Sequence, residues 1–444
     1  MAPLPAEPPV VASRSPFKPH ELILWSLALA GLSWCLVVAL RHPFEPGANT
    51  FSAFYYAALA VRNGTSILAA SKDYIYPPLM AWAFQPLTYL PVGTAYRVWL
   101  MLSLLLTSSS MFIGVRAFTR AMGAQPQWRA GITAIAFAFL LSLGEAKTAW
   151  SVAQCDGLVL DAFAFAFALL TRSPVLAGLT IALGANIKYQ TLILVPYLLW
   201  RRHFKVVAGT GFGMIIFGLM PMLSLGWQGN RDAWTSALGG LGRFIGLHSN
   251  QAADVHSLDW GSSISITSAI ARCVRDLNGS PVLLAALLLL VLTAVATAIV
   301  CIYKRYQLPL KGALDHGVQH TAILVAVEWC IVLAALLAFG PQTTRRHLFV
   351  LMLFHLFIAV WLLAPSMITR GRSLFISSLI AFQLALRLPP SAAWCQPASD
   401  AWKYIGGPSW LLIALCLAML ITAGQQVTSS NVKQRAGLRL KADF

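Results

Sequence analysis

Long apolar runs recur along the whole chain, and they constrain its fold more than any other feature. The first covers Glu21–Leu40, and similar stretches return as far as Trp410–Thr422. Of the 444 residues, 58% are hydrophobic and 11% are charged, whereas a soluble globular protein has roughly 25% charged residues. Helices are the structures that satisfy every backbone polar group of such segments in lipid. The sequence therefore predicts an all-α polytopic membrane protein.

Basic residues set the expected topology. The formal net charge is +17, and Lys and Arg of membrane proteins collect in cytoplasmic loops, so nucleic acid is not an expected partner. The basic clusters all fall on one side, with both termini in the cytoplasm, if the chain crosses the membrane about 12 times. The expected spans are 21–40, 94–115, 131–143, 150–170, 175–187, 190–200, 206–225, 282–302, 321–339, 348–363, 374–386 and 410–422.

This topology gives one transmembrane domain, 21–424, between two cytoplasmic tails. Residues 1–20 are rich in Pro and predict a disordered tail, and residues 425–444 form a basic tail. The first span has no cleavage site after it and is expected to be a retained anchor in the cell membrane. The large outer loops are 41–93, 226–281 and 389–408. Cys273 and Cys395 fall in two of these loops, where they could pair, and no Cys or His spacing suits a metal or cofactor.

The first outer loop has a pattern of its own. Five apolar residues recur at helical spacing and predict an amphipathic helix lying in the membrane interface, although an ordinary surface helix fits the same pattern. They are Phe51, Phe54, Tyr55, Ala58 and Leu59. Gly64 is expected to end this helix. Tyr76-Pro77-Pro78 then predicts an extended turn before a short apolar helix, re-entrant or interfacial, at 79–90.

Several charged residues lie in or beside apolar segments. Lys188 occupies the tip of a short hairpin and is either functional or reaches outward to the interface. Arg345, Arg346 and the adjacent His347 lie on the outer side, where such a cluster binds a phosphate or anchors the protein to lipid headgroups. Asp156 lies near the outer end of a span. Glu328 is deep in another span and is expected to contact a polar partner inside the bundle.

The order of these features resembles glycosyltransferase family 87, membrane enzymes of the GT-C fold that use polyprenyl-phosphate sugars. The segments that carry the resemblance are FSAFYYAALAVRNG, YPPLMAWAFQPLTYLPVGTAYRVWL, AQCDGLVL and RSPVLAGLTIALGANIKYQTLILVPYLLWRRHFK, with weaker echoes in SNQAADVHSL and TTRRHLFVLML. The resemblance implies a GT-C-like bundle, a polyprenyl-phosphate sugar donor and a lipid or glycan acceptor, with no cofactor. It favours mannose as the sugar.

The resemblance also nominates site residues. Lys188, Arg345 and Arg346 are the candidates for binding the donor phosphate. The candidates for lining the substrate are Thr50, Tyr55, Tyr56, Tyr76, Pro77, Pro78, Gln154 and Asp156. The family usually has an Asp, thought to be the catalytic base, where this chain has Thr50. A threonine hydroxyl is no base near neutral pH, so Glu45 and Asp73 of the same loop become the candidate bases.

The chemistry expected of such an enzyme explains why one carboxylate suffices. A glycosidase needs two carboxyl groups, one of which protonates a poor leaving group. A lipid phosphate leaves as a stable anion, so it needs positive charge and no proton. The predicted function is inverting hexosyl transfer to a hydroxyl acceptor on the outer face. The alternatives are a transporter or lipid carrier, which would often show two related halves that this sequence lacks, and an inactive member of the family.

Overall fold

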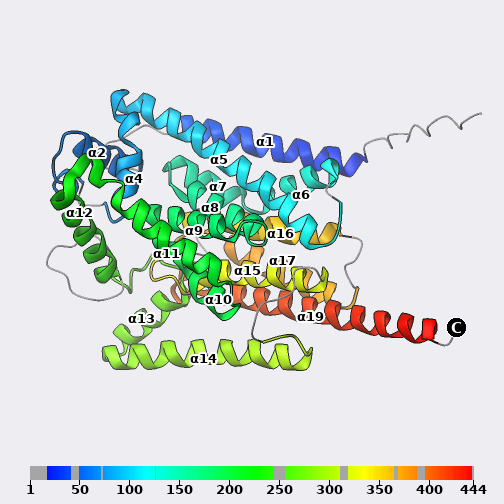
Figure 1. The fold of residues 1–444 in the computed structure, drawn as a ribbon. Coiled ribbons are helices and arrows are strands. Elements are labelled where there is room, and N and C mark those ends of the chain that lie inside the picture. The colour runs from blue at the N-terminus through cyan, green and yellow to red at the C-terminus, as the bar shows by residue number, and fades with distance from the viewer. Residues whose placement is uncertain are drawn as a thin grey trace, which may run out of the picture.

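The computed structural model describes residues 18–41, 50–71, 74–125, 127–244, 256–310, 319–364, 369–387 and 396–442. Within these ranges every regular element is a helix and there is no strand, as the apolar runs predict. The start of α1 (Pro19–Arg41) and the end of α19 (Gly407–Ala442) lie at the same end of the bundle, on the right of Figure 1. The short helices of the first outer loop lie at the opposite end.

Within the described ranges, six helical segments are long and apolar enough to cross a membrane. They are α1, α5 (Val92–Ala121), α14 (Pro281–Arg305), α15 (Gln319–Phe339), α16 (Leu351–Leu363) with the 3-10 turn η3 (Arg345–Val350) before it, and α19. The number rises to eight if each of two sharply bent pairs crosses as one span. In the first pair, α6 (Trp128–Leu141) and α7 (Leu143–Ser151) are bent by 70°. In the second, α11 (Phe204–Leu219) and α12 (Met222–Phe244) are bent by 99°.

The remaining expected spans are helical but do not qualify by length and composition. They are α8 (Asp156–Leu169), α9 (Pro174–Ile187), the 3-10 turn η2 (Tyr189–Ile193) with α10 (Leu194–Trp200), and α17 (Thr369–Arg387). A helix of 14 residues, such as α8 or α9, is ~21 Å long, and the hydrocarbon core is ~30 Å thick. α17 has a basic last turn with Arg387 and is not a candidate span either. The described part of the chain thus gives six to eight candidate spans.

Glycines let α9 and α11 cross at close range. A Cβ atom added to Gly178 would lie 2.2 Å from the carbonyl oxygen of Val206, and one on Gly209 would lie 2.6 Å from that of Val175. Backbone therefore packs against backbone at this crossing, which holds α9 in place against α11. The chain turns into an extended conformation immediately after α9, at Lys188 (φ −152°, ψ 123°).

The segment between α1 and α5, the expected first outer loop, folds into a compact cluster of short helices where the structure describes it. α2 (Thr50–Arg62) forms as its spacing predicts, and Gly64 with φ 66° follows it. Its aromatic residues Phe51, Phe54 and Tyr55 are buried by other side chains of the protein, and the predicted position of the helix in the membrane interface stays a prediction. The covering side chains come from elsewhere in the chain and include Tyr76, Phe84, Tyr96 and Trp99.

Three further short elements complete this cluster, and Pro77 precedes the second of them in an extended conformation as expected. They are α3 (Ile67–Ala70), α4 (Pro78–Ala83) and the 3-10 turn η1 (Gln85–Tyr89). The described parts of the other two expected outer loops contain the helices α13 (Ile266–Asp276) and α18 (Gln396–Tyr404). At the other end, α19 continues to Ala442 through most of the expected tail. Residues 1–17 and Cys395 lie outside the described ranges.

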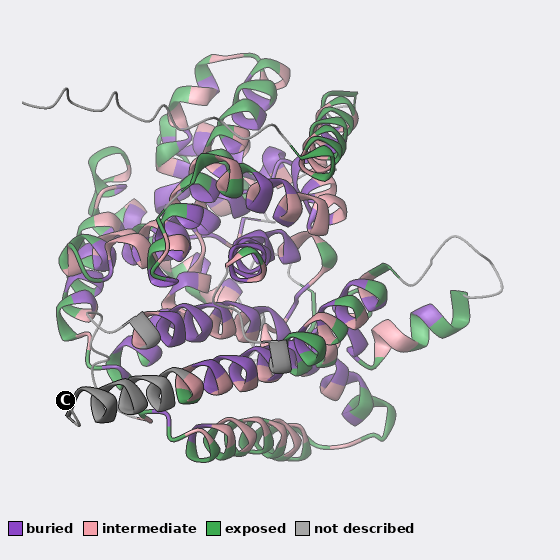
Figure 2. Cartoon of the chain, turned by 90° about the vertical axis from the view of Figure 1, so that its right-hand side faces the viewer, coloured by how far each residue is buried: buried purple, intermediate pink, exposed green. Residues whose placement is uncertain are grey.

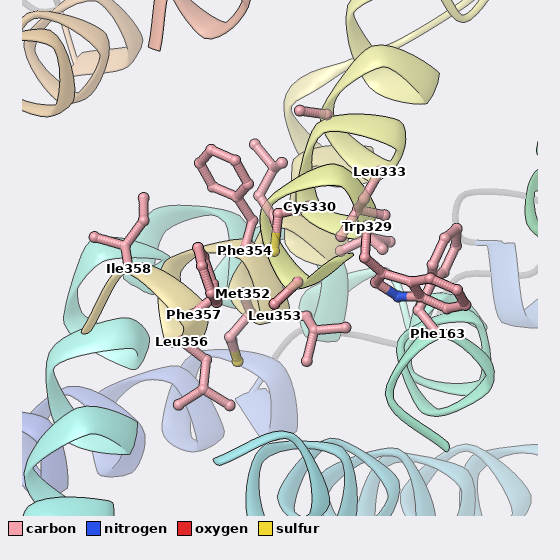
Figure 3. Close-up of a cluster of buried hydrophobic side chains, with 14 of the residues drawn as sticks. Phe163, Trp329, Cys330, Leu333, Met352, Leu353, Phe354, Leu356, Phe357 and Ile358 are labelled. Atoms are coloured by element: carbon pink, nitrogen blue, oxygen red, sulfur yellow. The ribbon is translucent and has the colours of Figure 1, made fainter. Parts of the chain in front are cut away.

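The core lies between α8, α15 and α16. Cys330 of α15 lies beside Phe354 of α16, whereas Trp329 points the other way, toward Phe163 of α8 (Figure 3). The rings of Phe163 and Trp329 meet nearly edge-on, with centroids 6.4 Å apart. Nearly every residue of α16 is buried, and buried residues occupy the middle of the molecule in Figure 2. This rigid centre supports η3 at one end of α16, so the arginines of η3 have a fixed base.

The polar partner predicted for Glu328 exists. The Arg201 guanidinium forms an ion pair with the Glu328 carboxylate, and both side chains are buried. The Tyr197 hydroxyl donates to the same carboxylate at 2.9 Å, and Tyr303 donates to it as well. Because an ion pair with these added hydrogen bonds is fully satisfied, this network holds α10, α14 and α15 together away from the outer loops.

Candidate active site

Tyr76 is held rigidly between the first outer loop and the bundle. The hydroxyl of neighbouring Tyr74 donates to the carbonyl oxygen of Pro77 at 2.8 Å and accepts from the backbone N–H of Ala81 at 2.9 Å. These bonds fasten the turn to the start of α4, where Pro78 takes the first helical position. The Tyr76 ring packs edge-on against Phe54 at 4.9 Å. Burial raises the pKa of Tyr76 well above its usual range, so its hydroxyl stays protonated.

Lys188 meets Asp156 where α9 ends and α8 begins. The distance between Lys188 Nζ and Asp156 Oδ1 is 2.5 Å, and the two side chains are 11% and 1% exposed. The other carboxylate oxygen of Asp156 is buried and has no hydrogen-bond partner among the described residues. Lys188 is therefore an ionised group fixed by a buried counter-charge, and reaching outward to solvent does not explain its position.

The arginines of η3 point in different directions. The Arg345 guanidinium faces Glu145 of α7, with 3.4 Å between its Nε and the carboxylate. The Nε atom of Arg346 is buried and meets no hydrogen-bond acceptor in the described ranges. His347 accepts the backbone N–H of Thr344 on its Nδ1 atom at 3.0 Å. Arg346 thus has a buried N–H group that no described residue accepts.

Tyr76, Lys188, Arg346 and His347 line one cavity of about 390 Å³, which is within the range of ~300–1,000 Å³ typical of small-molecule sites. Its other walls come from η2, from the end of α12, from residues 256–260 and from the turn between α15 and η3. The lining residues from these walls include Tyr189, Gln190, His256, Trp260, Gln342 and Thr343. Two cations and a tyrosine predicted from distant parts of the sequence therefore meet around one space.

Thr50 lies beside Gln154, whose side-chain N–H donates to the Thr50 hydroxyl at 2.9 Å. This contact joins the start of α2 to the loop before α8. The Tyr55 hydroxyl donates to the carbonyl oxygen of Leu90, and Tyr56 packs edge-on against Tyr55. None of Thr50, Tyr55 and Tyr56 belongs to the lining of the cavity described above.

Residues 74–326 match the sequence model of glycosyltransferase family 87, which is more than half of the chain. The chain belongs to glycosyltransferase family 87. It is therefore a glycosyltransferase, as the sequence resemblance implied. No curated protein matches this chain.

The matched range of this family member includes Tyr76, Asp156 and Lys188, which meet at or beside the cavity. It begins after Thr50 and ends before Arg345 and Arg346, so those positions depend on the resemblance of the quoted segments alone. Glu45 and Asp73, the candidate bases, lie outside the described residues.

Sequence reasoning about this glycosyltransferase missed part of the cavity wall. Tyr189 and Gln190 follow Lys188 directly, yet only the lysine carried a signal because it is charged in an apolar segment. His256 lies in a segment quoted for its family resemblance, and Trp260 follows it by four residues. An aromatic residue in an outer loop is common, so the pattern gave no reason to select either ring.

Proposed function

We propose that this glycosyltransferase transfers a hexose from a polyprenyl-phosphate donor to a hydroxyl acceptor at the outer face of the membrane, with inversion. Mannose is the sugar favoured by the family resemblance. The observation that carries the proposal is that Lys188 and Arg346 line one cavity. Tyr76, which belongs to the expected first outer loop, lines the same cavity.

The charges of the cavity suit a phosphodiester. Asp156 neutralises Lys188 through the 2.5 Å ion pair, which leaves Arg346 as the cation of the pair without a carboxylate contact among the described residues. A sugar linked to a lipid through one phosphate carries a single negative charge. Charge-assisted hydrogen bonds from Arg346 and Lys188 to its oxygens would stabilise both the bound donor and the departing lipid phosphate.

The transfer is a direct displacement at the anomeric carbon. The acceptor oxygen forms a bond to this carbon while the bond to the phosphate oxygen breaks, and the electron pair leaves on the lipid phosphate. A carboxylate takes the proton of the acceptor hydroxyl. Glu45 and Asp73 remain our candidates for that base, because Thr50 cannot fill the role.

The proposed arrangement in the membrane has about 12 crossings and cytoplasmic termini. Besides the six long segments, this arrangement counts each of the two bent pairs as a crossing. It also counts four shorter elements as crossings or part-crossings, namely α8, α9, η2 with α10, and α17. Helices buried within protein need not match the bilayer individually, which supports counting the short ones.

A transfer assay tests the function directly. Purified protein in liposomes would receive polyprenyl-phosphate mannose or glucose, radiolabelled in the sugar, with membrane lipids and glycans as acceptors. Labelled product that depends on Arg346 is the expected result. Binding of the lipid without transfer of either sugar would favour a carrier or an inactive member and would refute the proposal.

A further inference from the structure

An aromatic wall stands in the same cavity as the two cations. The rings of His256 and Trp260 are stacked, with centroids 4.0 Å apart and an angle of 15° between their planes. Both residues line the cavity. The faces of aromatic rings carry partial negative charge and attract polarised C–H groups. A stacked pair at the edge of a site therefore offers a flat surface for a ligand that has C–H groups on one face.

This wall is anchored on both sides. The Gln342 side chain donates to the carbonyl oxygens of His256 and Ser257, and the backbone N–H of Ile264 donates to that of Thr343 at 2.8 Å. The guanidinium of Arg272, a buried side chain of α13, donates to the carbonyl oxygen of Trp260 at 2.8 Å. These bonds use the backbone of the segment, so its two rings are left free to contact a ligand.

The neighbouring wall carries polar atoms without partners. The Tyr189 hydroxyl and the Gln190 amide oxygen are buried, and neither has a hydrogen-bond partner in the part of the chain that the structure describes. Both residues line the cavity beside Lys188. Buried polar groups are normally satisfied, and these two could exchange hydrogen bonds with a ligand that has several hydroxyl groups.

We propose that His256, Trp260, Tyr189 and Gln190 form the subsite for the sugar ring of the donor. A hexose has both features that these walls address, a face of C–H groups and a rim of hydroxyls. The sugar is assigned to the donor rather than to an acceptor glycan because Lys188 and Arg346 bind the phosphate in the same cavity. This inference rests on the proposed function and assigns the specificity of that site.

Binding of two lipids to the full-length protein in detergent separates the sugar from the phosphate. The probes are undecaprenyl phosphate and the same lipid carrying mannose or glucose, each titrated to give Kd. Wild type should bind one sugar-bearing lipid more tightly than the bare phosphate. Trp260→Ala should reduce this preference about threefold to tenfold, the size of one lost ring contact or hydrogen bond, with Kd for the bare lipid phosphate unchanged.

Matched variants keep the test decisive. Trp227→Ala removes a tryptophan of α12 that is 64% exposed and does not line this cavity, so it should change neither Kd. Gln190→Leu keeps the size of the side chain and should also reduce the preference, which covers the case in which Trp260→Ala does not fold. Equal weakening of both lipids by Trp260→Ala and Gln190→Leu, or no effect of either, would overturn the subsite.

Two further binding measurements separate the donor-sugar subsite from an acceptor site and from the phosphate site. In the first, methyl mannoside represents the acceptor. If Trp260→Ala loses binding of methyl mannoside but keeps the preference for the sugar-bearing lipid, the aromatic wall binds the acceptor, and the assignment to the donor is refuted. Lys188→Ala should weaken both lipids alike. If it weakens neither, the phosphate assignment of the proposed function fails, while the preference lost in Trp260→Ala still reports the sugar subsite.

Discussion

Lys188 and Asp156 show how a single ion pair organises this site. Their contact joins α8 to the end of α9 and keeps a cation at the wall of the cavity. A buried ion pair adds little net stability, but removing one partner leaves an uncompensated charge. The pair is therefore better explained by its position beside the cavity than by its contribution to folding.

Replacing Lys188 with Ala should weaken donor binding by about 1.5–3 kcal/mol, which corresponds to a charge-assisted hydrogen bond. The measurement is the Kd of undecaprenyl phosphate for the purified variant. Arg97→Ala is the control, because Arg97 is an exposed cation near the start of α5 and does not line the cavity. A well-folded Lys188→Ala protein with unchanged Kd would remove Lys188 from the site.

The identity of the base can be tested at the same scale. Glu45→Gln should slow the chemical step ~10²–10⁴-fold, the usual cost of losing a general base, while the Kd of the donor is retained. Single-turnover kinetics with the labelled lipid would measure this step. Retained turnover in Glu45→Gln, with loss in Asp73→Asn, would make Asp73 the base. Retention in both would locate the base outside this pair.

At the scale of elements, the crossing of α9 and α11 fixes where Lys188 lies. Gly178→Ala would place a Cβ atom 2.2 Å from the carbonyl oxygen of Val206, so the helices must separate. We expect a loss of about 1–3 kcal/mol in stability, measured as a lower midpoint of thermal unfolding. Gly211→Ala is the matched control on α11, because its Cβ would meet nothing within 4 Å. Equal midpoints in the two variants would contradict the close crossing.

The elements also show what sequence alone could supply. The apolar runs predicted nearly every long helix, and the charge of Lys188 marked the break after α9. The burial of α2 could not be predicted, since its aromatic cover comes from Tyr76, Phe84 and Trp99 in other segments. The pairing of Lys188 with Asp156, 32 residues apart, depends on how two helices pack. Local patterns carry no information about such contacts.

The topology is a property of the whole molecule, and cysteine labelling can determine it. In a background without the seven native cysteines, Thr65→Cys lies on an exposed part of the first outer loop. It should react with an impermeant maleimide in intact cells. Gln125→Cys lies in the expected inner loop after α5 and should react only after the cells are permeabilised. The reverse pattern would show that the chain is inserted in the opposite orientation.

The helix α14 lies at the edge of the bundle, at the bottom of Figure 1, and packs against it through one side that includes Val295 and Ile299. No residue of its most apolar stretch is buried, and along its length only Tyr303 is. Its 25 residues extend ~37 Å, more than a hydrocarbon core of ~30 Å. A helix longer than the hydrocarbon is accommodated by tilting or by local thickening of the bilayer. Because α14 is joined through a short turn to α13, which anchors Trp260, a change in the tilt of α14 would act on the segment that carries the aromatic wall of the cavity.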